Sequence, residues 1–272
     1  MSTLTYAVRD SVTMLRRNLL HAKRYPVSTT GTLVVPILLL LAFAGLFGNA
    51  LGAGLGVIAN GAVDYTDYLT PSVIVIAAAS GALSTALSVN LDMTAGIINR
   101  FRTMAISRAA VLTGHVLGSV IQTIIAIVLV IVVALVIGFR PNATAVEWLA
   151  AAGLLALLTL ALTWPAAAAG LAAKGPEGAS NIQLLAFLPI LGSGVVPPES
   201  MPAGVRWLAE HQPFTPIIET LRGLLVGTPI GNNAIIALAW CVGTALIGYL
   251  WARALFRRDP SSNSREVFTA VR

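Results

Sequence analysis

Side chains of the types that carry out chemistry are few in this sequence, and they are scattered. The three histidines are His21, His115 and His211, and Cys241 has no second cysteine for an intrachain disulfide. The chain has no His-Glu-x-x-His or Cys-x-x-Cys motif for a metal, and no Gly-x-x-x-x-Gly-Lys-Ser/Thr loop for nucleotide phosphates. We therefore expect no catalytic residue, no metal, no cofactor in this chain and no ATP hydrolysis by this chain alone.

Polar side chains within the apolar runs are the remaining candidates for a functional site. Asn90 and Gln183 are candidates to line a substrate path, although each could simply bond to a neighbouring helix. His115 is close to the start of an apolar run, which favours a position at the membrane surface over proton transfer. No carboxylate lies deep in an apolar run. This argues against a proton-coupled pump, because such pumps usually need ionisable groups within the membrane.

The elements that must hold these residues are long apolar segments. Between Arg108 and Arg140, 31 residues pass without a formally charged side chain, and about 20 apolar residues are enough to cross a bilayer as a helix. Charged residues make up only 10% of the 272-residue chain, against about 25% in soluble domains. The chain is therefore predicted to be a membrane protein. Because its basic residues lie between apolar runs, they are interpreted as orientation signals and not as a nucleic-acid site.

Hydropathy predicts an all-α, polytopic membrane fold with six transmembrane helices. The predicted spans are 33–51, 69–91, 111–137, 148–173, 179–196 and 234–253. The first is expected to remain uncleaved, because it follows a basic segment longer than the usual start of a signal peptide. The fifth is short and contains Pro189 and Gly192, so a kink is expected there.

The distribution of basic residues predicts the orientation. Fourteen of the 17 Lys and Arg residues fall on the side that holds both termini and the loops after the second and fourth spans. The other side holds only Arg140, Arg206 and Arg222. By the positive-inside rule, both termini are predicted to be cytoplasmic, in a bacterial plasma membrane. Trp148, Trp207 and Tyr68 fall at predicted span ends, where their rings are expected at the headgroup level.

The N-terminal segment 1–32 is predicted to form an amphipathic helix. Its apolar side holds Leu4, Val8, Val12, Leu15 and Leu19, and its basic residues project elsewhere. Such a helix lies in the membrane surface, attracted by anionic lipid. The alternative is a solvated helix packed on another chain.

A second amphipathic segment, 92–108, forms the longest internal loop of the predicted cytoplasmic side. On a helix, Met93, Ile97, Phe101 and Met104 share one face, while Arg102 points away and Arg100 lies at the rim. Periodicity alone leaves two interpretations open: a helix that inserts into a groove of a partner, or a helix at the membrane surface that only turns the chain.

The segment 199–228 is predicted to form a partly re-entrant helical hairpin on the outer side. It combines apolar residues with charges that would be costly to bury in lipid. Thr215 is expected to cap its second helix, with Pro216 as the first residue, and Gly227 to end it. Glu219 and Arg222 are i, i+3 neighbours and are expected to pair. The cytoplasmic tail is 257–272.

Two motifs carry a resemblance to a known family. The first is Asp92 followed by Gly-Ile at 96–97, Arg-Phe-Arg at 100–102 and Ile-Ser-Arg at 106–108; Met-Ala stands at 104–105, where the family commonly has a proline. The second is Met-Pro at 201–202, Trp-Leu-Ala at 207–209, Gln-Pro-Phe-Thr at 212–215 and Leu-Arg-Gly-Leu-Leu at 221–225. In this order, and across essentially the whole chain, the sequence resembles ABC-2 type permeases of the daunorubicin-resistance type.

The resemblance implies half of an exporter. Such a permease pairs with a second permease subunit, itself or a sister chain, and recruits two copies of an ATP-binding subunit that binds the ATP and Mg. Residues 1–32 would be the elbow helix and 33–256 the transmembrane domain. The segment 92–108 would be the coupling helix, with Ile97, Phe101 and Met104 docking on the ATPase and Arg100 and Arg102 forming polar contacts. The cargo would be amphipathic or lipid-like, on a path through spans one, two and five. The alternatives are a secondary transporter and a membrane scaffold.

Overall fold

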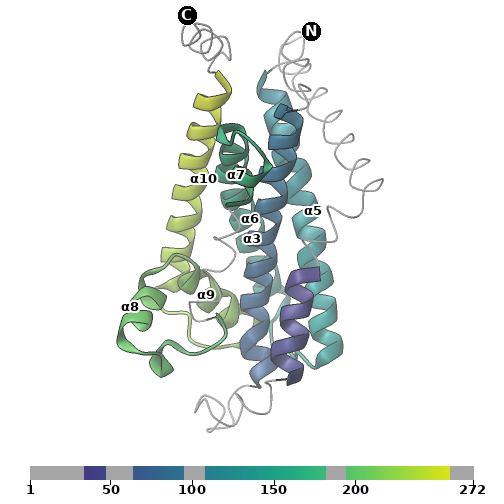
Figure 1. The fold of residues 1–272 in the computed structure, drawn as a ribbon. Coiled ribbons are helices and arrows are strands. Elements are labelled where there is room, and N and C mark those ends of the chain that lie inside the picture. The colour runs from purple at the N-terminus through teal and green to yellow at the C-terminus, as the bar shows by residue number, and fades with distance from the viewer. Residues whose placement is uncertain (1–33, 47–63, 95–107, 182–193, 258–272) are drawn as a thin grey trace, which may run out of the picture.

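The computed structural model describes residues 34–46, 64–94, 108–181 and 194–257, and all regular secondary structure in these ranges is helical (Figure 1). Four helices are long and apolar enough to cross a membrane. They are α3 (Tyr65–Thr94), α5 (Arg108–Ile137), α6 (Ala145–Ala172) and α10 (Asn233–Arg257). The shorter helices are Val34–Leu46, α7 (Pro176–Ser180), η3 (Pro198–Ser200), α8 (Ala203–His211) and α9 (Phe214–Val226).

These four long helices coincide with the second, third, fourth and sixth predicted spans. Local capping explains why α6 begins three residues before the expected position. The hydroxyl of Thr144 accepts a hydrogen bond from the backbone N–H of Glu147, whose carboxylate accepts one from the backbone N–H of Thr144 at 2.6 Å. This capping box satisfies two of the backbone donors that every helix start leaves without a partner.

The first and fifth predicted spans are only partly described. The helix Val34–Leu46 lies within the first span, but at about 1.5 Å per residue it is too short by itself to cross a bilayer. Of the fifth span, 182–193 lies outside the described residues. Its start, Ala179 and Ser180, belongs to the five-residue helix α7. The predicted elbow helix, most of the coupling segment and the C-terminal tail from residue 258 also lie outside them.

Helix α3 packs against both α5 and α6 (Figure 1) and is the most buried of the four long helices. In its most apolar stretch 78% of the residues are buried, against 28% in α5, 33% in α6 and 17% in α10. The outward faces of α5 and α10 carry large apolar side chains such as Val136, Ile235 and Ile247. The bundle is thus apolar both in its core and on its outer surface. Such a surface is compatible with lipid, because lipid tails are as apolar as the side chains that would contact them.

The two ends of the bundle differ. Helices α3, α6 and α10 run in one direction and α5 in the opposite one, so that α3 ends where α5 begins (Figure 1). Helix α7 lies at this end, which we call the α7 end. Helices α8 and α9 lie beside the starts of α3, α6 and α10, at what we call the α9 end.

Glycine permits close approach at three helix contacts. A Cβ added to Gly81 on α3 would lie 2.6 Å from Cγ2 of Thr123 on α5. At Gly170 on α6 it would lie 2.4 Å from the carbonyl oxygen of Ala86 on α3, and at Gly248 on α10 it would lie 2.4 Å from Cδ of Pro165 on α6. Small residues have this role in membrane bundles, where close packing of backbones contributes much of the helix association.

Four buried threonine hydroxyl groups are satisfied within their own helices. Thr85, Thr123, Thr159 and Thr163 each donate to the carbonyl oxygen four residues earlier, at 2.6–3.0 Å. A buried hydroxyl without such a bond would be costly. The polar threonines therefore need no partner on another helix.

Replacement of Gly170 by alanine is expected to weaken the contact between α3 and α6. The new methyl group would meet a backbone carbonyl, which cannot rotate away as a flexible side chain can, so the helices must shift. We expect a loss of about 1–3 kcal/mol, the usual cost of overpacking, measured as a lower thermal unfolding midpoint in detergent. Gly153→Ala, on the open face of the same helix, is the control. It should leave the midpoint unchanged or raise it, since alanine favours helix by about 1 kcal/mol.

Candidate functional site at the two ends of the bundle

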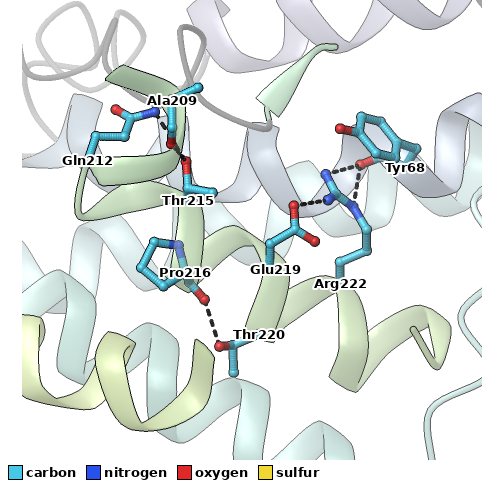
Figure 2. Close-up of polar contacts among 8 residues, drawn as sticks. All are labelled: Tyr68, Ala209, Gln212, Thr215, Pro216, Glu219, Thr220 and Arg222. Carbon is cyan, nitrogen blue, oxygen red and sulfur yellow. Dashed lines mark hydrogen bonds and ion pairs between the residues drawn. The ribbon is translucent and has the colours of Figure 1, made fainter. Parts of the chain in front are cut away.

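Arg222 is the buried cation of the α9 end. It lies on α9, is only 3% exposed, and pairs with Glu219 one turn earlier, with 2.5 Å between Nη1 and Oε1 (Figure 2). Its Nε and Nη2 donate to the backbone carbonyl of Tyr68 on α3, at 3.3 and 3.2 Å. The guanidinium carbon is 3.8 Å from the centre of the Tyr68 ring. The predicted pair of Glu219 and Arg222 is confirmed.

The carbonyl that Arg222 binds belongs to a turn of α3 that a proline disturbs. Pro71 lies inside α3 and has no N–H for the carbonyl four residues earlier, that of Asp67. The carbonyl of Tyr68 is in this turn. A planar guanidinium can give two donors to one oxygen and still pair with a carboxylate. Arg222 thus ties α9 to a weak point of the central helix.

The position of Tyr68 differs from the sequence-based expectation of a ring at the membrane surface. Its side chain is 6% exposed, packed under Arg222 and stacked with Tyr65 at 6.5 Å between ring centres. The hydroxyl of Tyr65 donates to the carbonyl of Val195, 130 residues away, at 3.3 Å. Tyr65 therefore contacts the segment that precedes the α8–α9 unit, and the ring of Tyr68 contacts Arg222 on α9.

The two helices expected in the segment 199–228 are present, and Gly227 ends α9 with a left-handed φ of 85°. The expected cap is wrong: α9 begins at Phe214, and Thr215 is inside its first turn. The hydroxyl of Thr215 donates instead to the carbonyl of Ala209 on α8 at 2.5 Å (Figure 2). Thr215 therefore holds α8 against α9.

The two helices of this unit are embedded to different degrees. The apolar face of α9 packs in the main core through Phe214, Ile217, Ile218, Leu221 and Leu225. Helix α8 is mostly exposed, with Trp207 62% exposed and the ion pair of Arg206 and Glu210 open to the surroundings. The unit therefore combines an inner helix fixed to the bundle with an outer amphipathic helix. Whether it enters the membrane remains a prediction.

The loop between α5 and α6 is hydrogen-bonded to both α3 and α9 at the α9 end. The backbone N–H of Arg140 donates to Oδ1 of Asp67 on α3 at 2.8 Å, and the N–H of Asn142 donates to the carbonyl of Leu225 on α9 at 2.9 Å. Phe139, in the same loop, is fully buried. Together with Arg222, these bonds join the start of α3, this loop and α9.

Asn90 lies at the opposite, α7 end, and its environment bears on the choice between a path and a helix contact. It is fully buried on α3, and its Nδ2 donates to the carbonyls of Gly170 and Ala173 at 3.1 and 2.8 Å. These belong to the last carbonyls of α6, which the helix itself leaves without donors. Asn90 thus caps the neighbouring helix, as the second interpretation expected. A role of Asn90 in the path remains a prediction.

A second polar contact at the α7 end joins α3 to α5. Nε2 of His115 on α5 lies 3.0 Å from Oδ2 of Asp92 on α3, and the two side chains are 4% and 17% exposed. The sequence-based expectation of His115 at the membrane surface does not include this partner. Residue spacing carries no signal for this pair, because Asp92 lies two residues before the end of α3 whereas His115 lies seven residues after the start of α5.

The other residues predicted to be functional cannot be placed. Ile97, Arg100, Phe101, Arg102, Met104 and Gln183 lie outside the described residues. Of the segment 92–108, residues 92–94 form the last turn of α3 and Arg108 begins α5. In the described part of the chain, no group of three or more His, Cys, Asp or Glu side chains could hold a metal ion.

Comparison with known proteins identifies the family of this chain. A family model described as ABC-2 type transporter matches residues 10–226 of the chain. The chain belongs to the ABC-2 type transporter family. The resemblance inferred from the two motifs is thereby confirmed, and the second motif corresponds to the α8–α9 unit that carries Glu219 and Arg222.

Several relatives of this ABC-2 permease are named as permeases. It is 28% identical over 243 residues to the daunorubicin resistance ABC transporter permease protein DrrB1 of Streptomyces coeruleorubidus. The aligned region covers 89% of this chain and 83% of that protein. It is 23% identical over 240 residues to the probable doxorubicin resistance ABC transporter permease protein DrrC of Mycobacterium tuberculosis, with 86% and 84% covered. It is 24% identical over 256 residues to the putative transport permease ycf38 of Porphyra purpurea, with 92% and 84% covered.

Removal of the buried cation should destabilise the ABC-2 permease far more than removal of an exposed one. Arg222→Met leaves Glu219 without its ion-pair partner and removes two donors from the Tyr68 carbonyl, so we expect a loss of about 3–5 kcal/mol. The matched control is Arg206→Met, which breaks the exposed pair with Glu210 and should cost about 0–1 kcal/mol. Thermal unfolding in detergent measures both. Equal effects would contradict the anchoring role of Arg222.

Proposed function

We propose that this chain is the membrane-spanning subunit of an ATP-driven exporter. Its cargo would be amphipathic or hydrophobic, such as a drug-like molecule, a lipid or a glycolipid, moved out across the plasma membrane. The observation that carries the proposal is the family match over residues 10–226, together with relatives named for daunorubicin and doxorubicin resistance. The apolar bundle and the lack of a phosphate-binding motif in the sequence support a transport subunit that depends on an ATPase of another chain.

The partners follow from this proposal. Two ATP-binding subunits would bind ATP and Mg, and a second permease, itself or a sister chain, would complete the pathway. Docking on the ATPase is assigned to the coupling segment 92–108, through Ile97, Phe101 and Met104 with Arg100 and Arg102 beside them. In support, the described parts of this segment, residues 92–94 and Arg108, are at the α7 end of the bundle.

The α7 end is proposed to face the cytoplasm of a bacterial cell. Basic residues support this orientation, because Arg108, Lys174 and Arg253 belong to this end while the α9 end has six acidic residues for three arginines. Both termini would then be cytoplasmic, and the α8–α9 unit would lie outside as the hairpin that helps to close the exit. The path would run along spans one, two and five, with Asn90 and Gln183 as candidate lining residues.

A negative charge on the coupling face should abolish docking. Phe101→Asp would bring a carboxylate into the apolar groove of the ATPase, where it has no partner, so we expect the ATP-binding subunit no longer to copurify from detergent while expression of the permease survives. Asn99→Asp is the matched control. It introduces the same charge about half a helical turn away and should leave copurification intact. Unchanged copurification of Phe101→Asp would remove the docking role from this face.

The proposed orientation can be tested by labelling single cysteines on a Cys241→Ala background. A cysteine in place of Asn60, in the loop after the first span, should react with a membrane-impermeant maleimide on intact cells, because this loop is proposed to face outward. A cysteine in place of the exposed Glu177 on α7 should react only after lysis. The reverse pattern would contradict the orientation.

A further inference from the structure

The last turn of α3 contacts both neighbouring helices through polar side chains. On one side Asp92 lies 3.0 Å from Nε2 of His115 on α5. On the other, the amide of Asn90 donates to the Gly170 and Ala173 carbonyls at the end of α6. All three polar side chains are largely buried. We call Asn90, Asp92 and His115 the α7-end clamp.

The position of the clamp in the chain is the second observation. Asp92 lies two residues before the end of α3, and His115 lies seven residues after the start of α5. The two side chains therefore bridge the pair of helices that hold the coupling segment. The last carbonyls of a helix have no partner within the helix, so a terminal turn frays unless other groups hold it. The amide of Asn90 supplies such a donor to the end of α6, and the contact of Asp92 with His115 joins the last turn of α3 to α5.

Asp92 and His115 are close enough for a direct ion pair, with 3.0 Å between Oδ2 and Nε2. A protonated imidazole attracts the carboxylate and so holds α3 and α5 together. In a site largely shielded from water such a contact is stronger than at an exposed surface, because the local dielectric constant is lower.

We propose that Asn90, Asp92 and His115 are positioning residues that transmit nucleotide-driven movement from the coupling segment to α5 and α6 together. This inference rests on the proposed function, since it requires an ATPase that moves the segment. Without the clamp, a displacement of the segment would bend the last turn of α3 and stop there. With the clamp, α3, α5 and α6 move as one body, and the movement reaches the α9 end.

The test compares clamp variants in the complete complex of permease and ATP-binding subunit. On a Cys241→Ala background, a cysteine replaces Val136, the 84% exposed residue near the α9 end of α5. Its rate of reaction with a maleimide is measured without nucleotide and after trapping with ATP and vanadate. We expect trapping to change the rate when the clamp is intact. Asp92→Asn and His115→Ala should reduce this nucleotide effect about fivefold or more, in the range of coupling between linked sites.

Two controls separate transmission from folding and from docking. Asp92→His combined with His115→Asp restores the pair in reverse and should recover most of the nucleotide effect. Glu177→Gln removes an exposed carboxylate on α7 at the same end and should leave the effect intact. All variants should copurify with the ATP-binding subunit as the unmodified chain does. The proposal is wrong if the single variants keep the nucleotide effect, if they lose the ATP-binding subunit, or if the reversed pair is no better than they are.

A stability cycle keeps this test independent of the proposed function. If the unmodified permease binds no ATP-binding subunit, the proposed function fails, and the clamp is then judged by thermal unfolding of the permease alone. Asp92→Asn, His115→Ala and the double variant should give non-additive changes of the unfolding midpoint, because each single change already removes the shared contact. Additive changes would overturn the clamp itself.

Discussion

The close approach of α3 to α5 and α6 is the constraint on which the rest of the structure depends. In lipid the hydrophobic effect does not drive helices together. Their association depends on close packing of the backbones and on hydrogen bonds across the interface. Gly81 and Gly170 supply the fit at the two faces of α3. The polar bonds lie near its two ends, at Arg222 in one direction and at Asn90 and Asp92 in the other.

The placement of charge follows from the same constraint. In the described residues, the buried cation Arg222 and the buried His115 both have carboxylate partners, and they occur close to helix ends and not in the middle of the bundle. Between them, hydroxyl groups bond to their own helices. A central stretch of this kind has few groups that could bind a polar solute. It suits an exporter of amphipathic cargo, whose apolar part needs no specific partner.

Much of this fold could be predicted because it depends on local rules. Four spans follow from hydropathy alone, the pair of Glu219 and Arg222 from helical spacing, and the end of α9 from Gly227. The tertiary partners could not be predicted. Nothing near Tyr68 indicates that a residue 154 positions later would bind its carbonyl, and Thr215 has the sequence context of a cap but bonds to α8 instead. These contacts depend on how the helices meet, which residue spacing does not encode.

The link between Arg222 and the Tyr68 carbonyl limits how this protein can open. If α9 swung away from α3, two N–H groups of the guanidinium would lose the Tyr68 carbonyl that accepts both hydrogen bonds, and a buried polar group without a partner is costly. Helices α3 and α9 are therefore bound to travel as a single rigid piece. A passage for cargo would then have to open at helix contacts made by alkyl side chains alone. Such contacts can separate without leaving a buried polar group that has lost its partner.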